Sequence, residues 1–289
     1  KNLNYKKKYG KYMDIFKKLS NIKKRYYSQG CQDAQVEFII ENIKIKNNFC
    51  IEFGYEGNSY IHKNNFPNTG DLILNKKWEH LLLDGKWFNK KMNLYQHHIT
   101  PKNICDIFKK YKVPIEIGYL SIDLDTIDFW VLDSILKEYT PSFYIVEYNP
   151  NFPIDSAIVW PNDSKEIWER DSVMNSSLKA YYLQGKKYGY SLVYAEKAES
   201  VIIDGKKKWK YHHDAFFIND TLLDGVIVPK LEDFKFTQTM LKKRCETGRE
   251  NIYLDYEEFL KTGDVDKAKE KALPICKKWL CSSWGPMSG

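Results

Sequence analysis

Acidic and amide side chains stand at the ends of two apolar segments, where their oxygens are suited to binding a cation. Asp123 and Asp125 end an apolar run over residues 118–123, and Glu147 and Asn149 end another over residues 143–147. Carboxylate and amide oxygens are the hard ligands that Mg²⁺ and Ca²⁺ prefer. A charge at the end of a buried strand also needs a partner, because an unpaired buried charge is costly. These four residues therefore predict a site for Mg²⁺.

The alternative interpretation of the same residues is purely structural. Asp125 or Asp128 would cap the helix that we expect to begin near Phe129, and Asn149 would turn the chain before Pro150. For Asp128 we favour the capping role.

A glycine and two acidic residues after the first two apolar segments form a pattern typical of nucleoside binding. Gly54 closely follows Glu52, and Asp84 ends the next segment along the chain. Glycine lets the backbone approach a ligand closely, and an acidic residue on the following strand accepts hydrogen bonds from ribose hydroxyls. Each feature alone is also typical of an ordinary turn. Their order and spacing together favour a nucleoside site.

Two histidines are candidate general bases, because imidazole titrates near neutral pH. His98 stands near the end of the third apolar segment, and His213 precedes the last one. We expect Asp123, His98 and His213 to handle the proton of an acceptor group. The alternative is that the histidines are ordinary surface or core residues, which is the commoner case.

These residues lie within an alternating pattern of apolar strands and amphipathic helices. Near-continuous apolar strands separated by helices predict an α/β fold, with a parallel sheet covered on both faces. The charged segment 196–214 leaves no room for a crossover helix, so we expect the last two strands to form an antiparallel hairpin. This outline predicts a Rossmann-like methyltransferase fold with a mostly parallel seven-stranded sheet and a C-terminal antiparallel hairpin. The predicted strands are residues 49–54, 80–85, 94–99, 118–123, 143–147, 190–195 and 215–218, and the predicted helices are 33–43, 101–111, 129–136 and 177–188.

Charge divides the 289 residues unevenly. The net charge is +7, yet residues 1–27 carry ten Lys or Arg and one Asp, which leaves the remaining chain slightly negative. Apolar residues at helical spacing among these lysines predict an amphipathic helix. We expect a basic amphipathic N-terminal arm over residues 1–27, a central domain over 28–222 and a helical C-terminal extension over 223–289. The arm would pack on the domain or bind an anionic lipid or glycan surface; nucleic acid is the least favoured partner, because no recognition motif accompanies the arm.

The six cysteines indicate a reducing environment. None has the spacing of a zinc site, and two fall inside apolar runs, where cysteine acts as a small hydrophobe. No apolar segment approaches the roughly 18 residues that would span a bilayer. We therefore expect an intracellular, cytoplasmic protein with reduced cysteines.

The ordered set of motifs resembles the FkbM-type branch of class I S-adenosylmethionine-dependent methyltransferases. The resemblance covers residues 27–220, and its most specific part is the segment around Asp123. It implies methyl transfer to a hydroxyl and places Glu52 and Gly54 at the cofactor loop, with Asp84 on the ribose and Asp123 beside the methionine portion or the acceptor. We also expect Gln29 to bind the cofactor. The motifs are Ser28-Gln29, Glu52-Phe53-Gly54, Asn68-Thr69, Leu82-Leu83-Asp84-Gly85, Ser121-Ile122-Asp123-Leu124-Asp125 with Asp128, and Glu147-Tyr148-Asn149.

The function that we expect from these observations is an S-adenosylmethionine-dependent O-methyltransferase acting on a sugar, glycan or small molecule, with Mg²⁺ as a second cofactor. Two alternatives stay open. Glu56 and Asn58 stand where the resemblance expects glycines, which favours a binding module without catalysis. The basic arm favours an RNA methyltransferase.

Overall fold

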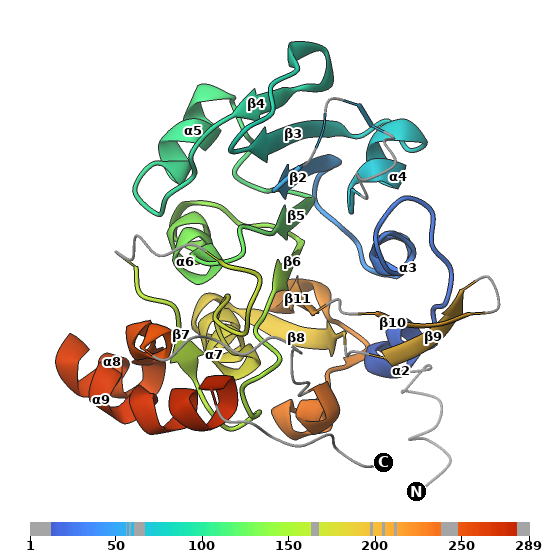
Figure 1. The fold of residues 1–289 in the computed structure, drawn as a ribbon. Helices are drawn as coiled ribbons and strands as arrows, with labels where there is room; N and C mark the ends of the chain where they lie inside the picture. Colours follow the sequence, from blue (N-terminus) through green and yellow to red (C-terminus); the bar gives the residue numbers. More distant parts are fainter. Residues whose placement is uncertain are drawn as a thin grey trace, which may run out of the picture.

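A seven-stranded sheet forms the centre of the molecule, as Figure 1 shows. The structure is a computed structural model, and it describes residues 13–55, 57, 59–60, 67–162, 168–196, 199–203, 206–210, 213–237 and 248–281. The strands of the sheet are β2 (Phe49–Phe53), β3 (Glu79–Asp84), β4 (Leu94–Gln96), β5 (Tyr119–Ile122), β6 (Phe143–Glu147), β8 (Tyr190–Ala195) and β11 (Asp214–Asn219).

The order of the strands across the sheet is β4-β3-β2-β5-β6-β11-β8. The first five strands in this order, β4, β3, β2, β5 and β6, pair in parallel. Strand β11 is antiparallel to both of its neighbours, β6 and β8. A parallel sheet with one reversed strand near its end is the methyltransferase variant of the Rossmann fold, so the predicted fold class is confirmed. The predicted hairpin is the β8–β11 pair, and a two-stranded ribbon of β9 (Glu199–Ile203) and β10 (Lys206–Lys210) lies between them in the chain.

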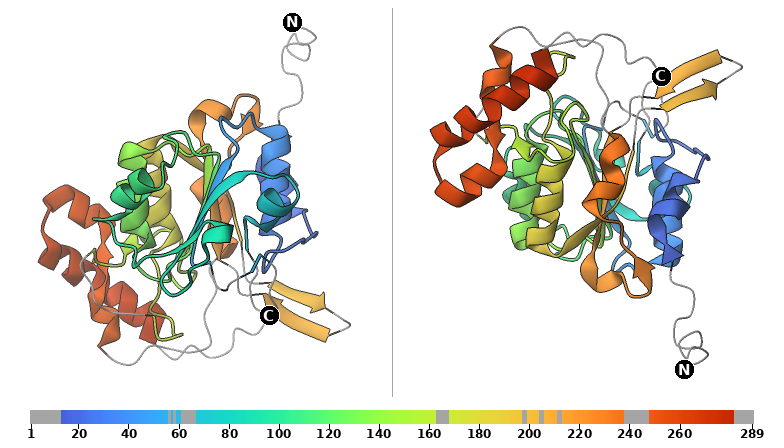
Figure 2. Two further views of the ribbon diagram at one scale, coloured as in Figure 1. Left: turned by 90° about the horizontal axis from the view of Figure 1, so that it is seen from above. Right: turned by 90° about the horizontal axis from the view of Figure 1, so that it is seen from below.

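Helices cover both faces of the sheet (Figure 2). Helices α2 (Ile15–Ser20), α3 (Gln32–Asn42) and α4 (Gly70–Leu74) pack on one face, and α5 (Ile104–Lys110), α6 (Asp128–Glu138) and α7 (Leu178–Tyr188) pack on the other. Neighbouring residues of a strand enter opposite cores: Ile51 faces α5–α7, and Cys50 faces α2–α4. Within the described ranges, no helix is both long enough and apolar enough to cross a lipid bilayer.

The ends of two helices show how local sequence sets their bounds. The Ser177 side chain accepts a hydrogen bond from the Ala180 N–H at the start of α7, and Gly189 ends that helix with φ at +76°. Helix α5 begins later than predicted. The Asn103 Oδ1 accepts the N–H of Thr100 at 2.8 Å, which holds residues 100–103 in a turn ahead of the helix.

The N-terminal segment belongs to the fold from residue 13 onward. Strand β1 (Met13–Asp14) pairs in parallel with β12 (Val226–Ile227), and Ile15 and Leu19 of α2 are fully buried in the core on the α2–α4 face. Residues 1–12 of the predicted arm lie outside the described residues. The expected boundary at residue 28 therefore does not separate residues 13–27 from the domain, because their apolar side chains complete its core.

A helical extension packs against the segment that follows β6. Strand β13 (Leu254–Asp255) pairs with β7 (Ile158–Val159), and Tyr253 and Trp160 share a separate buried core. The extension forms an outer layer beside α6 and α7 (Figure 2). Its helices are α8 (Tyr256–Thr262), α9 (Val265–Cys276) and a π-helical turn at Lys277–Cys281.

Short 3₁₀ turns also occur along the described parts of the chain. They are Lys90–Met92, Asp220–Leu222, Leu231–Thr237 and Arg249–Ile252.

Candidate functional site

The strand order reverses between β2 and β5, and the ends of these two strands meet there. From β2 the chain proceeds outward to β3 and β4, whereas β5 begins the other half of the sheet. Open α/β sheets bind ligands at such a reversal, beyond the carboxyl ends of the strands. Gly54 follows β2 with φ at +69°, and a Cβ built on it would lie 2.3 Å from the Asp123 carbonyl oxygen after β5. Only glycine leaves room for the backbone here.

Glu52 binds the two residues just before α4 rather than facing outward. Its carboxylate accepts the backbone N–H of Asn68 at 2.8 Å and of Thr69 at 3.0 Å, and the Thr69 hydroxyl also donates to it. Asn68 in turn donates from Nδ2 to the Ser121 Oγ on β5 at 3.1 Å. Burial raises the pKa of Glu52 to about 6, although the hydrogen bonds from Thr69 and Asn68 oppose the rise. Glu52 is thus a brace between β2 and the start of α4.

Asp84 ends β3 at the same edge of the sheet and shapes its own turn. Its Oδ1 accepts the N–H of Lys86 at 2.6 Å and of Trp87 at 2.9 Å. Within the described part of the chain, Oδ2 has no hydrogen-bond partner, so this oxygen is available to a ligand hydroxyl. Gln29 is exposed in the turn before α3, and its backbone carbonyl accepts a hydrogen bond from Arg25.

Three of the four predicted cation ligands come together at the carboxyl ends of β5 and β6. Asp123, Asp125 and Glu147 each offer an oxygen within 4.8 Å of the others. Asp125 takes a left-handed backbone conformation, with φ at +65°. This conformation is costly for most residues but is tolerated by Asp, and it is concentrated at functional sites.

The electrostatics of this acidic cluster (Asp123, Asp125 and Glu147) favour a bound cation. The Asp123 side chain is exposed on one side, yet the protein around the rest of it displaces hydrating water and raises its pKa well above the usual value, and the charges of Asp125 and Asp128 add to the rise. Burial likewise raises the pKa of Glu147, and the negative charges of Asp123 and Asp125 raise it further. A divalent cation would relieve the repulsion between these carboxylates. Their oxygen-only chemistry fits Mg²⁺, Mn²⁺ or Ca²⁺.

Asn149 does not join the acidic cluster. It is buried, and its Nδ2 donates to the carbonyls of Ser172 and Met174 at 3.0 and 2.9 Å. Its Oδ1 accepts both the backbone and the side-chain N–H of Asn151, at 3.0 and 2.8 Å. Because both ends of the amide serve the loop after β6, we leave Asn149 out of the ligand set.

Asp128 has a structural role, but a different one from the predicted cap. It is the first residue of α6, and the residue before it caps the helix without a side-chain hydrogen bond. The Asp128 carboxylate accepts the backbone N–H of Leu124 at 2.8 Å and of Thr126 at 3.1 Å. Burial raises its pKa to about 7, against those two hydrogen bonds. Asp128 therefore fixes the turn that presents Asp125.

A second acidic pair at the same edge was not predicted. Asp214 begins β11 directly opposite Glu147, and Glu196 follows β8. Gln32 Nε2, at the start of α3, donates to both carboxylates, at 2.8 Å to Asp214 and 2.9 Å to Glu196. Burial raises the pKa of Asp214, and hydrogen bonds from Gln32 and Glu196 oppose the rise. The predicted hairpin did place residues 196 and 214 at this edge, which is the signal that could have found them.

The two predicted histidines lie at different distances from the acidic cluster. His98 is exposed beyond β4, which is three strand spacings from β5, or about 14 Å. His213 is buried just before β11, and its ring packs edge-on against Tyr148 at 6.1 Å between centroids. Its backbone carbonyl accepts the Tyr148 N–H at 2.8 Å. His213 thus lies beside the end of β6, and His98 does not.

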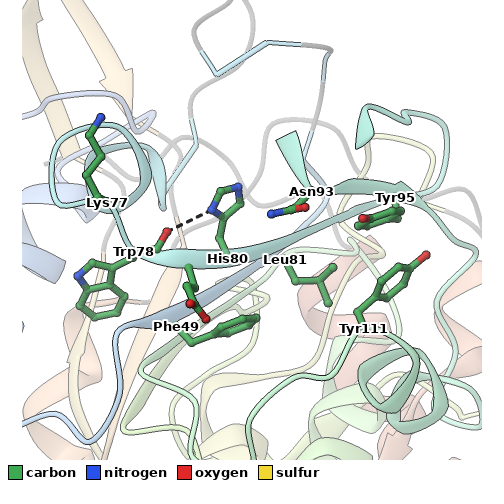
Figure 3. A pocket seen from close by; sticks show the side chains of 9 residues that line it. Phe49, Lys77, Trp78, His80, Leu81, Asn93, Tyr95 and Tyr111 are labelled. Carbon is green, nitrogen blue, oxygen red and sulfur yellow. Dashed lines mark hydrogen bonds between the residues drawn. The ribbon is translucent and has the colours of Figure 1, made fainter. Parts of the chain in front are cut away.

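A hollow of about 420 Å³ lies at the opposite end of the sheet (Figure 3). It is formed where β2 and β3 begin, whereas the acidic cluster stands where β5 and β6 finish. His80 Nδ1 lies 3.2 Å from the carbonyl of Trp78 at its rim. The hollow is therefore separate from the predicted site. Its walls are Phe49, Lys77, Trp78, Glu79, His80, Leu81, Asn93, Tyr95 and Tyr111.

Comparisons with known proteins leave the family assignment open. No family model matches this sequence, and no curated protein matches it. Among solved structures, the chain is similar to M. jannaschii TYW2, whose crystal structure is in complex with AdoMet. The two share 14% sequence identity, the match covers 68% of this chain and 79% of that chain, and the TM-score is 0.26. A TM-score this low carries no argument, and the fold assignment stands on the strand order of this molecule.

Proposed function

We propose that this chain is an S-adenosylmethionine-dependent methyltransferase that methylates a hydroxyl of a sugar, glycan or small-molecule acceptor. The observation that carries the proposal is the reversal point of the sheet. There Gly54 and Asp123 meet without an intervening side chain, and Asp84 stands one strand away. This is the arrangement that a nucleoside cofactor needs.

Each residue at the reversal point has a distinct part in holding the cofactor. Asp84 accepts hydrogen bonds from the ribose hydroxyls through its open Oδ2. Gly54 gives the ligand access to the backbone, and Glu52 ties the start of α4 to the end of β2 by its bonds to Asn68 and Thr69. Asp123 faces the methionine portion, where a carboxylate complements positive charge.

Asp123 and its two acidic neighbours, Asp125 and Glu147, are also proposed to bind and activate the acceptor. S-adenosylmethionine supplies a methyl group whose bond to sulfur breaks as the bond to the acceptor oxygen forms. Asp123, Asp125 and Glu147 would hold a Mg²⁺ ion, which would supply Lewis-acid chemistry that lowers the pKa of an acceptor alcohol. The hydroxyl proton passes to a group at the edge of the acidic cluster, for which His213, beside Tyr148, is the candidate. Holding the acceptor oxygen in line with the methyl group of the cofactor lowers the activation barrier further.

Calorimetric titration with S-adenosylmethionine tests the cofactor proposal, with Asp84→Asn as the diagnostic variant. Asparagine keeps an oxygen for the Lys86 and Trp87 N–H groups but loses the charge at the open position. We expect wild-type protein to bind and the variant to bind roughly 10-fold to 100-fold more weakly, from the loss of charge-assisted hydrogen bonds. An equal affinity for both proteins would exclude Asp84 from the ribose.

Turnover of a panel of hydroxylated acceptors, followed by formation of S-adenosylhomocysteine, tests the reaction. Activity should fall on addition of EDTA and return with Mg²⁺, and Asp123→Asn should reduce the recovery. Binding of the cofactor without turnover of any acceptor would favour a binding module. Turnover that chelation leaves unchanged would remove Mg²⁺ and keep the methyltransferase.

A further inference from the structure

Asn175 joins the segment before α7 to the acidic cluster. It is fully buried, and its backbone N–H donates to the Asp125 carbonyl at 3.0 Å. Its side-chain Nδ2 donates to Glu147 Oε2 at 2.8 Å. The residue therefore contacts two of the three members of the acidic cluster, although it lies 28 positions beyond Glu147 and was not among the predicted ligands.

The side-chain oxygen of Asn175 has no hydrogen-bond partner within the residues that the structure describes. A buried amide oxygen without a partner is costly, so such an atom calls for a donor or a cation. The orientation of the amide is set by Glu147, because an amide oxygen facing a carboxylate oxygen would be repelled. Oδ1 shares one carbon with the nitrogen that donates to Glu147, so this electron-rich atom lies close to the Glu147 carboxylate.

The geometry points to Asn175 Oδ1 as the fourth protein ligand of a divalent cation held by Asp123, Asp125 and Glu147. The inference rests on the Mg²⁺ of the proposed function and adds Asn175 to its three ligands, whereas the sequence had predicted Asn149 as the fourth. An amide oxygen is a ligand of the kind that Mg²⁺, Mn²⁺ and Ca²⁺ accept. The Nδ2 contact then becomes a hydrogen bond between two ligands, which fixes the orientation of both.

The surrounding segment holds Asn175 in place for this role. The preceding residue, Met174, accepts hydrogen bonds at its carbonyl from the Tyr253 hydroxyl at 2.5 Å and from Asn149 at 2.9 Å. The Ser172 hydroxyl donates to the Leu280 carbonyl at 2.9 Å. A ligand seated this firmly costs little ordering entropy when the cation binds.

Titration of the full chain with Mn²⁺, followed by electron paramagnetic resonance of the free ion, tests the inference without relying on turnover. We expect wild-type protein to bind Mn²⁺ and Asn175→Ala to bind it about tenfold or more weakly. Asn175→Asp keeps an oxygen ligand and should bind at least as tightly as wild type. Asn42→Ala removes an exposed amide at the end of α3, which contacts its own helix, and should bind like wild type.

The outcomes separate this inference from the proposed function. If Asn175→Ala is folded and binds Mn²⁺ like wild type, the ligand assignment is overturned. If Asn175→Ala does not fold, Asn175→Asp decides: affinity at or above wild type supports the ligand role, and a loss of tenfold or more contradicts it. Wild-type protein that binds no Mn²⁺ but still consumes S-adenosylmethionine would overturn the cation site and leave methyl transfer standing.

Discussion

At the scale of single residues, the close approach of Gly54 to Asp123 gives the most direct test of the reversal point. A Cβ on residue 54 would lie 2.3 Å from a backbone oxygen, which cannot move aside as a side chain can. We expect Gly54→Ala to separate the ends of β2 and β5 and to abolish detectable binding of S-adenosylmethionine, measured by calorimetry.

Gly189 is the matched control for Gly54. It also has a positive φ, at +76°, but a Cβ there would meet no atom within 4 Å. Gly189→Ala carries the same backbone cost without the collision, and so it should keep its affinity for the cofactor. Equal affinity in the two variants would show that the contact at Gly54 does not shape the site.

Glu52 gives a prediction about pH. Its pKa in the folded protein is about 6, against 4.5 for an exposed glutamate, because burial disfavours the charged form. The folded state therefore holds this proton more tightly. The resulting stabilisation is fully present below pH 4.5 and is lost as the pH rises through about 6, an effect of roughly 2 kcal/mol on the free energy of unfolding.

Urea denaturation of wild type and Glu52→Gln across this pH range measures that contribution. Glutamine does not titrate, so the variant should lack this part of the pH dependence, whatever its absolute stability. Glu79→Gln, at the exposed start of β3, should retain the wild-type profile. A Glu52→Gln profile parallel to that of wild type would contradict the assignment.

At the scale of elements, the sequence predicted the strands with strong apolar patterns and missed features that depend on short helices or on contacts between distant residues. Residues 143–147 and 190–195 are strands with the predicted bounds, because their sequences are almost entirely apolar. The third strand stops at Gln96 because its partner β3 ends at Asp84, the residue opposite Gln96, and turns there through the Lys86 and Trp87 N–H groups. Helix α4 has five residues, too few to show a helical period.

The candidate site shows the same division. Asp123, Asp125 and Glu147 were predictable, because the ends of adjacent parallel strands must meet at one edge. The choice between Asn149 and Asn175 was not. The Asn149 side chain donates hydrogen bonds to Ser172, Met174 and Tyr253, and these bonds keep it out of the acidic cluster. Tyr253 lies 104 positions along the chain, and no local sequence pattern encodes such a contact.

Helix α2 carries a prediction about the N-terminal segment. Leu19 is fully buried in the core on the α2–α4 face, and Phe16 packs edge-on against Phe234 at 5.3 Å between ring centroids. Leu19→Ala should lower the free energy of unfolding by about 2–5 kcal/mol, through lost burial and the cavity left behind. Lys18→Ala, exposed on the same helix, should change it by less than about 0.5 kcal/mol. Equal effects of the two substitutions would mean that α2 does not contribute to the core.

At the scale of the whole molecule, charge and fold are distributed differently. Residues 1–12 contain five lysines and no acidic residue, whereas the proposed site is surrounded by carboxylates. We propose that the first twelve residues attract the chain to an anionic surface, independently of the cofactor site.

Removal of residues 1–12 tests this separation, because it spares Ile15 and Leu19. The shortened chain should bind S-adenosylmethionine like the full chain but lose most of its binding to vesicles that contain phosphatidylserine. Binding of the full chain should weaken as salt is added. Retention of vesicle binding by the shortened chain would place the attraction elsewhere.

The extension that packs behind the β6 segment also sets an order of events during synthesis. The sheet needs the chain only as far as Asn219, but the segment that carries Asn175 is held by Tyr253 and Leu280. A ribosome releases the residues of β2 to β11 before those anchors leave its tunnel, and domains fold as they emerge. The nascent chain can therefore assemble the ends of β2 and β5 first, and the segment that carries Asn175 gains its anchors only after Tyr253 and Leu280 have emerged.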